Sequence, residues 1–188
     1  TLAWFHTRPE SDIDLFIVVR PGAIWSTRLL AVAPFILFGR RPHDVRPVTD
    51  PFCFSFFATT DVLDLEPLRL GNGDPYLAYW TRSVMPVFDR GGVFEKFWGK
   101  NQWMYESLPH VPTLRVGESL NALPTLRIGI FERLARRIQM RRLPARMRAL
   151  ANQDSRVVIS DHMLKFHDND RREEYRRRFE WTQGFYGS

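Results

Sequence analysis

Cysteine is almost absent from this sequence. Cys53 is the only cysteine in 188 residues, so neither a disulfide nor a metal site built from several cysteines can form within them. A chain of this length buries roughly 70% of its unfolded surface, which is enough for a core without such cross-links. The scarcity of cysteine is typical of a reducing compartment, and we expect a cytoplasmic protein.

Long hydrophobic runs are also missing. The longest apolar run covers residues 29–38 and contains Pro34, whereas a membrane-spanning helix needs about 20 apolar residues. We therefore expect no association with a membrane. The sequence begins with Thr1 rather than methionine, and we expect that further residues precede it in the complete protein.

Acidic residues are clearly outnumbered by basic ones only in the C-terminal third. Residues 1–124 contain 12 Lys and Arg against 13 Asp and Glu, while residues 125–188 contain 15 against 8. The net charge of +6 is thus concentrated where it suits a polyanionic partner or, equally, a solvated arginine-rich surface. The overall composition, 44% hydrophobic and 14% aromatic, is globular and excludes a disordered chain.

The N-terminal half predicts strands separated by a helix. Residues 12–19 are rich in β-branched and aromatic side chains and stop at a Pro-Gly pair, which predicts a buried strand. Residues 52–59 predict a second strand. Between them, residues 24–38 carry apolar side chains at helical spacing around Pro34. We therefore expect an α/β fold in which helices flank a small mixed sheet.

The remaining sequence is predicted to be mainly helical. We expect helices at 76–88, 93–108, about 125–143 and 171–181, and a short strand at 156–160. Residues 111–124 lie in a proline-containing stretch and are predicted to connect a domain of residues 1–110 to a basic, mainly helical C-terminal region of residues 125–188. We find no internal repeat.

The predicted helix that begins at Thr125 has two patterned faces. One face is apolar, formed by Leu126, Ile130, Leu134 and Ile138. Another face carries arginines at the same period, namely Arg133, Arg137 and Arg141. These arginines are a candidate nucleic-acid surface, and a solvated helix face is the alternative interpretation.

Asp12 and Asp14 are the strongest candidates for chemistry. Residues two apart on a strand share one face, so both carboxylates point to the same side of residues 12–19. Two carboxylates on an apolar strand are costly to bury unless a cation lies between them. The pair therefore predicts a site for Mg²⁺ or Mn²⁺, since Mg²⁺ is commonly held by one or two carboxylates together with substrate phosphates.

The segment Ser11-Asp-Ile-Asp-Leu-Phe-Ile-Val18 resembles the metal-binding strand of the polymerase-beta-like nucleotidyltransferase superfamily. That family places a Gly-Ser pair at a helix start, with the serine about eleven residues before the first aspartate, the spacing between Thr1 and Asp12 here. The resemblance implies two metals at Asp12 and Asp14 that align an attacking hydroxyl with the α-phosphate of a nucleoside triphosphate. It also implies that Thr1 and Ser11 help to position the phosphates or the metal loop. It names no acceptor.

The sequence departs from the family in two places. Phe5 stands where a small residue is usual, and the strand at 52–59 lacks the third carboxylate that the family takes from a later strand. Ser55 stands about where that carboxylate is expected, and Asp50 and Asp61 flank the strand. Two alternatives remain open: a catalytically degenerate nucleotidyltransferase-like module that binds nucleotide, RNA or protein, and a metal-dependent glycosyltransferase, which also uses Asp-x-Asp.

Histidine and tryptophan give weaker signals. His162 and His167 are five residues apart, which is not the spacing of a helical metal-binding pair, so we assign them to the structure or the surface. Trp80, Trp98 and Trp103 are expected to pack helices, with base stacking as the alternative.

Overall fold

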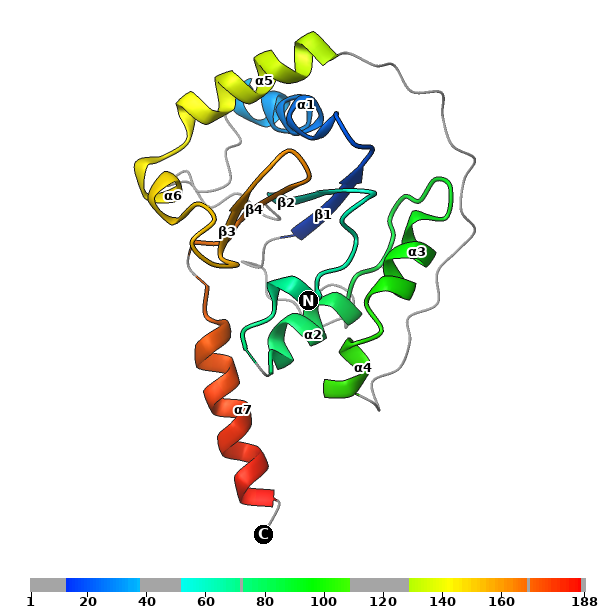
Figure 1. The fold of residues 1–188 in the computed structure, drawn as a ribbon, viewed down its shortest axis with the longest axis vertical. Helices are drawn as coiled ribbons and strands as arrows, with labels where there is room; N and C mark the ends of the chain where they lie inside the picture. Colours follow the sequence, from blue (N-terminus) through cyan, green and yellow to red (C-terminus); the bar gives the residue numbers. More distant parts are fainter. Residues whose placement is uncertain (1–12, 38–51, 72, 109–128, 169, 187–188) are drawn as a thin grey trace. The chain divides into compact units, whose positions relative to one another are not determined.

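The protein is a mixed α/β protein (Figure 1). The computed structural model describes residues 13–37, 52–71, 73–108, 129–168 and 170–186. In this part of the chain, helices accompany a four-stranded mixed sheet, which confirms the predicted class.

The chain divides into two compact units, and each of them is formed by two separate segments. The first, here the sheet unit, comprises Thr1–Val62 and Pro124–Asp168; the second, here the helical unit, comprises Leu63–Leu123 and Asn169–Ser188. The predicted division at residues 110 and 125 remains a prediction. The C-terminal segment contributes two strands to the sheet: Val157–Ile159 lies within the strand predicted at 156–160, and Met163–Phe166 was not predicted.

The sheet unit combines a parallel β-α-β segment with a later hairpin. Its elements are β1 (Ile13–Val19), α1 (Ile24–Leu37), β2 (Phe52–Thr59), α5 (Gly129–Arg142), α6 (Ala145–Leu150), β3 (Val157–Ile159) and β4 (Met163–Phe166). The strand order is β1-β2-β4-β3. β1 and β2 are parallel, as a helical crossover requires, while β4 is antiparallel to both of its neighbours. Between β1 and α1, Gly22 adopts a φ of 77°, which favours glycine.

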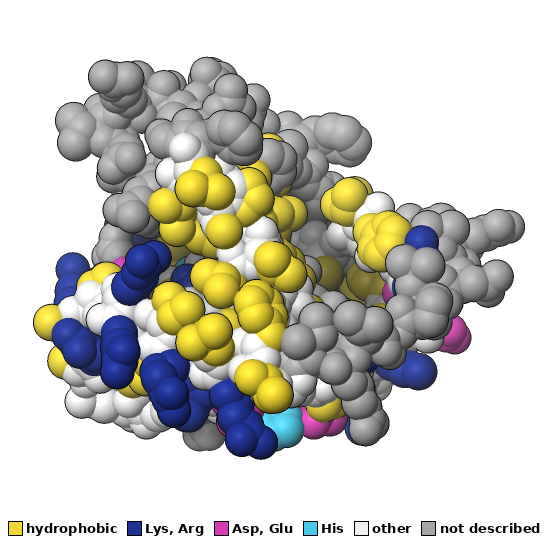
Figure 2. Space-filling model, turned by 90° about the horizontal axis from the view of Figure 1, so that it is seen from above, with side chains coloured by type: hydrophobic (Ala, Val, Ile, Leu, Met, Phe, Trp, Pro, Cys, Tyr) yellow, Lys and Arg dark blue, Asp and Glu magenta, His cyan; other side chains and the backbone are white. Residues whose placement is uncertain are grey.

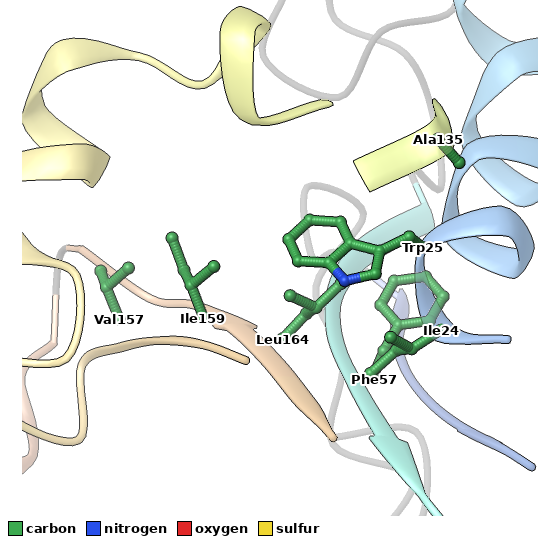
Figure 3. Close-up of a cluster of buried hydrophobic side chains, with 7 residues drawn as sticks. All are labelled: Ile24, Trp25, Phe57, Ala135, Val157, Ile159 and Leu164. Atoms are coloured by element: carbon green, nitrogen blue, oxygen red, sulfur yellow. The ribbon is translucent and has the colours of Figure 1, made fainter. Parts of the chain in front are cut away.

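The apolar core of the sheet unit lies between the sheet and its helices. The buried side chains shown in Figure 3 are Ile24, Trp25, Phe57, Ala135, Val157, Ile159 and Leu164. Ile17 and Val19 of β1 pack against this cluster from the sheet. They are two residues apart, so this face of β1 points toward the core.

A carboxylate from α5 caps the start of α1. The first backbone N–H groups of a helix have no partner within it. Glu132 accepts hydrogen bonds from the backbone N–H groups of Trp25 and Ser26 at 2.7 and 2.8 Å. Gln139 donates from the same helix to the carbonyl of Trp25 at 2.7 Å. The side of α5 that contacts α1 therefore includes Ala135 and these polar residues, whereas Ile130 and Leu134 of the apolar stripe are 86% and 50% exposed.

The helical unit is held together by buried polar groups. Its elements are the 3-10 helix η2 (Glu66–Leu68) and the helices α2 (Pro75–Arg82), α3 (Val93–Lys100), α4 (Met104–Ser107) and α7 (Arg172–Tyr186). Asp74 caps α2 by accepting from the N–H of Leu77 at 2.8 Å. The buried guanidinium of Arg172 donates to Asp74 at 2.9 Å, to Asp170 at 2.8 Å and to the carbonyl of Leu68 at 2.9 Å. This network joins α7 to α2.

A buried asparagine divides the helix predicted over residues 93–108. Asn101 is fully buried, ends α3 and precedes α4. Its amide donates to the carbonyls of Leu63 and Phe97, and its carbonyl accepts from the N–H of Leu65. The helix predicted over 76–88 likewise ends early, at Arg82, because Pro86 lies a few residues ahead and disfavours helical geometry just before it.

Arg82 differs from Arg172 in its surroundings. It is 2% exposed, and its Nε and Nη1 atoms have no hydrogen-bond partner among the described residues. The guanidinium instead lies over the rings of Tyr105 and Trp98, with its central carbon 4.2 and 6.0 Å from their centroids. Trp98 thus packs within the helical unit, as predicted.

Candidate functional site

Asp14 stands near the start of β1, at one edge of the sheet. The side chain is exposed. Phe16 follows two residues later and stacks against Phe56 of β2, with ring centroids 4.7 Å apart, whereas Ile17 and Val19 belong to the core on the α1 side. Because side chains alternate along a strand, Asp14 and Phe16 share the face opposite α1. This face of the sheet is called the Asp14 face below.

An irregularity in β2 changes which of its side chains reach the Asp14 face. Asp14 pairs with Cys53 and Phe16 with Phe56, so one residue of β1 lies opposite two residues of β2. Phe54 contacts Phe35 of α1 at a centroid distance of 4.9 Å, on the core side. Such bulges re-aim side chains and are common beside active sites.

Three side chains continue the Asp14 face toward β4. The thiol of Cys53 donates to Oγ of Ser55 at 3.1 Å, and Ser55 Oγ lies 3.2 Å from Nε2 of His167. Both contacts are within hydrogen-bond reach. Cys53, Ser55 and His167 are each half-buried.

Backbone pairing and packing fix His167 just beyond β4. Its N–H donates to the carbonyl of Arg156 at 3.0 Å, and its ring meets the edge of Phe56 at a centroid distance of 6.4 Å. Lys165 precedes it by two residues on the same strand and is buried, with Nζ donating to the carbonyl of Ser155 at 2.6 Å. The Asp14 face therefore carries an acid, a thiol, a hydroxyl, an imidazole and an ammonium group from three neighbouring strands and their ends.

The predicted site residues fall into two groups. Asp14 is described, and the structure places it on a strand as expected. Thr1, Ser11 and Asp12 lie outside the described residues, as does Asp50. Of the predicted site residues, the structure thus describes Asp14, and Ser55, which stands about where the third carboxylate was expected, lies on the same face of the sheet.

Asp61 does not supply a third carboxylate beside Asp14. It follows the far end of β2, whose last residue, Thr59, stands six residues and about 20 Å along the strand from Cys53, the partner of Asp14. Its carboxylate is engaged there: Thr59 donates to it, and Nδ1 of His162 lies 2.9 Å away. The hydrogen bond from Thr59, more than the nearby imidazole, lowers the pKa of Asp61.

Within the described ranges, no group of three or more His, Cys, Asp and Glu side chains is close enough to hold a metal ion. Asp14 offers the hard oxygen donor that Mg²⁺ prefers. A metal at the Asp14 face would therefore take further ligands from Asp12, from phosphate or from water.

Sequence reasoning missed the role of His167 in this arrangement. The available signal was the mainly apolar segment Met163–Phe166, a strand of four residues that ends directly before the histidine. Pairing with β2, more than one hundred residues earlier in the sequence, brings His167 to Ser55.

The predicted arginine surface is exposed. Arg133, Arg137 and Arg141 are all exposed along α5. In Figure 2, which looks down on the α1 and α5 end of Figure 1, Lys and Arg side chains gather beside an exposed apolar area. A polyanion can therefore reach these arginines, and solvent can do so equally.

No protein family model matches this chain, and no curated protein or solved structure matches it either. Among the described helices, none has the length and apolar character needed to cross a membrane. The function is therefore inferred from the chemistry of the chain's own residues.

Proposed function

We propose that the protein is a metal-dependent nucleotidyltransferase, which moves a nucleoside monophosphate from a nucleoside triphosphate to a hydroxyl acceptor. The observation that carries this proposal is the position of Asp14: an exposed carboxylate on the first strand of a parallel β-α-β segment, on the sheet face opposite the connecting helix. Asp12 precedes it by two residues in the Ser-Asp-Ile-Asp-Leu segment. The mixed sheet and its helices support a nucleotidyltransferase fold.

The residues of the Asp14 face suit this chemistry. Asp12 and Asp14 would hold Mg²⁺ or Mn²⁺, which neutralises the triphosphate and polarises the α-phosphate when bound. Thr1 and Ser11 would contact the phosphates or support the metal loop. The acceptor hydroxyl attacks the α-phosphorus, the bond to the bridging oxygen of the β-phosphate breaks, and pyrophosphate leaves.

A degenerate binding module is the second candidate function. It is favoured by one observation, the absence of any acid on β2 where the family resemblance implies a third carboxylate. In that case the Asp14 face would bind nucleotide without turnover. Arg133, Arg137 and Arg141 would extend either function to a nucleic-acid partner. A glycosyltransferase remains a weaker alternative, since it too pairs Asp-x-Asp with a divalent metal.

The products that carry the labelled phosphate distinguish these candidate functions. The protein is incubated with Mg²⁺ and each nucleoside triphosphate, labelled at the α- or at the γ-phosphate, with glycerol added as a generic hydroxyl. A nucleotidyltransferase releases the γ label in pyrophosphate and retains the α label in nucleoside monophosphate or its glycerol ester. Binding without release indicates the degenerate module, and turnover confined to nucleotide sugars indicates the glycosyltransferase.

A further inference from the structure

We infer that Ser55 and His167 form a proton relay that takes the place of the missing third carboxylate. This inference rests on the proposed function and assigns a role to two side chains that the Asp-x-Asp motif does not include. The observation is that Ser55, which stands about where that carboxylate is expected, lies 3.2 Å from Nε2 of His167.

The relay lies beside the metal-binding residues of the proposed site. Asp14 is paired with Cys53 across neighbouring strands, whose backbones are about 4.8 Å apart, and Ser55 shares the Asp14 face with Cys53. His167 lies one strand further, so its backbone is about 10 Å from that of Asp14. That separation leaves room for an acceptor hydroxyl between the two side chains.

The hydrogen-bonding capacity of Ser55 fits a relay. A serine hydroxyl has one proton to donate and two lone pairs to accept with. One lone pair accepts from the thiol of Cys53, and the proton can be donated to Nε2 of His167. The second lone pair is then available to the acceptor hydroxyl. The charged groups that face this pair are Asp14 from β1 and the buried Lys165 from β4.

The proposed step balances without a further reactant. The acceptor oxygen forms a bond to the α-phosphorus as its proton passes to Oγ of Ser55. The proton of Ser55 passes to Nε2 of His167, which becomes an imidazolium. The bond between the α-phosphorus and the bridging oxygen breaks, and pyrophosphate takes the electron pair. Proton transfer to a positioned base of this kind contributes about 10² to 10⁴ in rate.

Paired histidine variants provide the first test. His167→Gln keeps an amide that can hydrogen-bond Ser55 but cannot take up a proton, while His162→Gln alters a histidine at the far end of β2, beside Asp61. We expect pyrophosphate release from Mg²⁺ and ATP, with glycerol as acceptor, to fall about 10²-fold or more for His167→Gln. We expect no change for His162→Gln, and unchanged ATP binding for both.

Further variants distinguish a proton relay of Ser55 and His167 from a role of these side chains in packing alone. Ser55→Ala should lose a similar factor in rate, and the double variant with His167→Gln should lose little more, since residues acting as one unit are not additive. Added imidazole should restore part of the rate of His167→Gly, because a free base can replace the side chain. A packing role predicts additive losses and no rescue by imidazole.

The outcomes separate the relay from the function on which it rests. Selective loss in His167→Gln with ATP binding retained, together with imidazole rescue of His167→Gly, supports the relay. Full pyrophosphate release by His167→Gln overturns the relay and leaves the nucleotidyltransferase intact. Failure of the unaltered protein to release pyrophosphate overturns both. A Ser55 and His167 pair that merely packs is shown by NMR: the His167 ring signals then stay unchanged when Mg²⁺ and α,β-methylene-ATP bind, and this overturns the relay.

Discussion

The two compact units bury different kinds of side chains. The sheet unit has an apolar cluster between its sheet and its helices. Its Asp14 face carries Asp14, Cys53, Ser55 and His167. The helical unit buries Asp74, Arg82, Asn101 and Arg172 within its core. Buried polar side chains that hydrogen-bond within the protein stabilise the fold. Polar side chains on one face of a sheet can instead contact a ligand. The comparison therefore assigns stability to the polar residues of the helical unit and chemistry to those of the sheet unit.

We expect the largest loss of stability when Arg172 is replaced. Arg172→Met leaves the carboxylate of Asp74 buried without its guanidinium partner, and we expect a loss of about 3–5 kcal/mol in the free energy of unfolding, measured in urea. Arg178→Met is the matched control on the same helix, because its ion pair with Glu174 is exposed and screened by solvent, so its loss should change stability much less. Equal losses in the two variants would contradict a stabilising role for the buried network.

We expect a smaller loss of stability when the cap on α1 in the sheet unit is removed. Glu132→Ala removes the acceptor of the Trp25 and Ser26 N–H groups, and we expect a loss of about 1–2 kcal/mol. Glu132→Gln keeps one acceptor oxygen and should lose less. Thermal unfolding of both variants checks this order. If Glu132→Ala leaves the stability unchanged, water replaces the carboxylate as the cap.

Arg82 differs from the other buried polar residues of the helical unit, because it is not expected to stabilise the fold. Its guanidinium is buried over aromatic rings with two nitrogens lacking partners, so Arg82→Met removes a desolvated charge and keeps the packing. We expect stability to be unchanged or raised by about 1 kcal/mol in the urea measurement used for Arg172→Met. A loss of several kcal/mol would show that an anion or a water network compensates the charge.

The smallest effect concerns pH and Asp61. The pKa of Asp61 is lowered in the folded protein, chiefly by the hydrogen bond from Thr59. Its contribution to stability is therefore fully present above its unfolded pKa of about 3.9 and is lost as the pH falls through the lower folded pKa. The difference in stability between the protein and Asp61→Asn should be measurable at pH 7 and shrink below about pH 4. A difference independent of pH would contradict this assignment.

Local sequence patterns were sufficient for the β-α-β segment. β2 has the bounds predicted for it, Phe52–Thr59, because seven of its eight residues are apolar or β-branched, and Ser55 is the exception. Asp14 was found for the same reason, since it interrupts such a run. The class of the fold and the position of Asp14 on its strand were therefore predictable.

Long-range pairing limited what else could be predicted. β4 has four residues and owes its place to antiparallel pairing with β2 and β3, so the position of His167 beside Ser55 has no local signature. The contact of α5 with α1 was not predicted, because Glu132 and Gln139 make it through hydrogen bonds, which hydrophobic periodicity does not detect. Asn101 divides a predicted helix by bonding to residues that precede α2 in the sequence.

Calorimetry of nucleotide binding tests the central claim most directly. Each of the four nucleoside triphosphates is titrated into the protein with Mg²⁺ and again with a chelator, and the titrations are repeated with Asp14→Asn and with the control Asp154→Asn, an acid paired with Arg156 before β3. The proposed site predicts binding only with Mg²⁺, abolished by Asp14→Asn and unaffected by Asp154→Asn, since the carboxylate must hold the cation that neutralises the phosphates. Binding that persists in the chelator or survives Asp14→Asn would contradict a metal-dependent nucleotide site on this face.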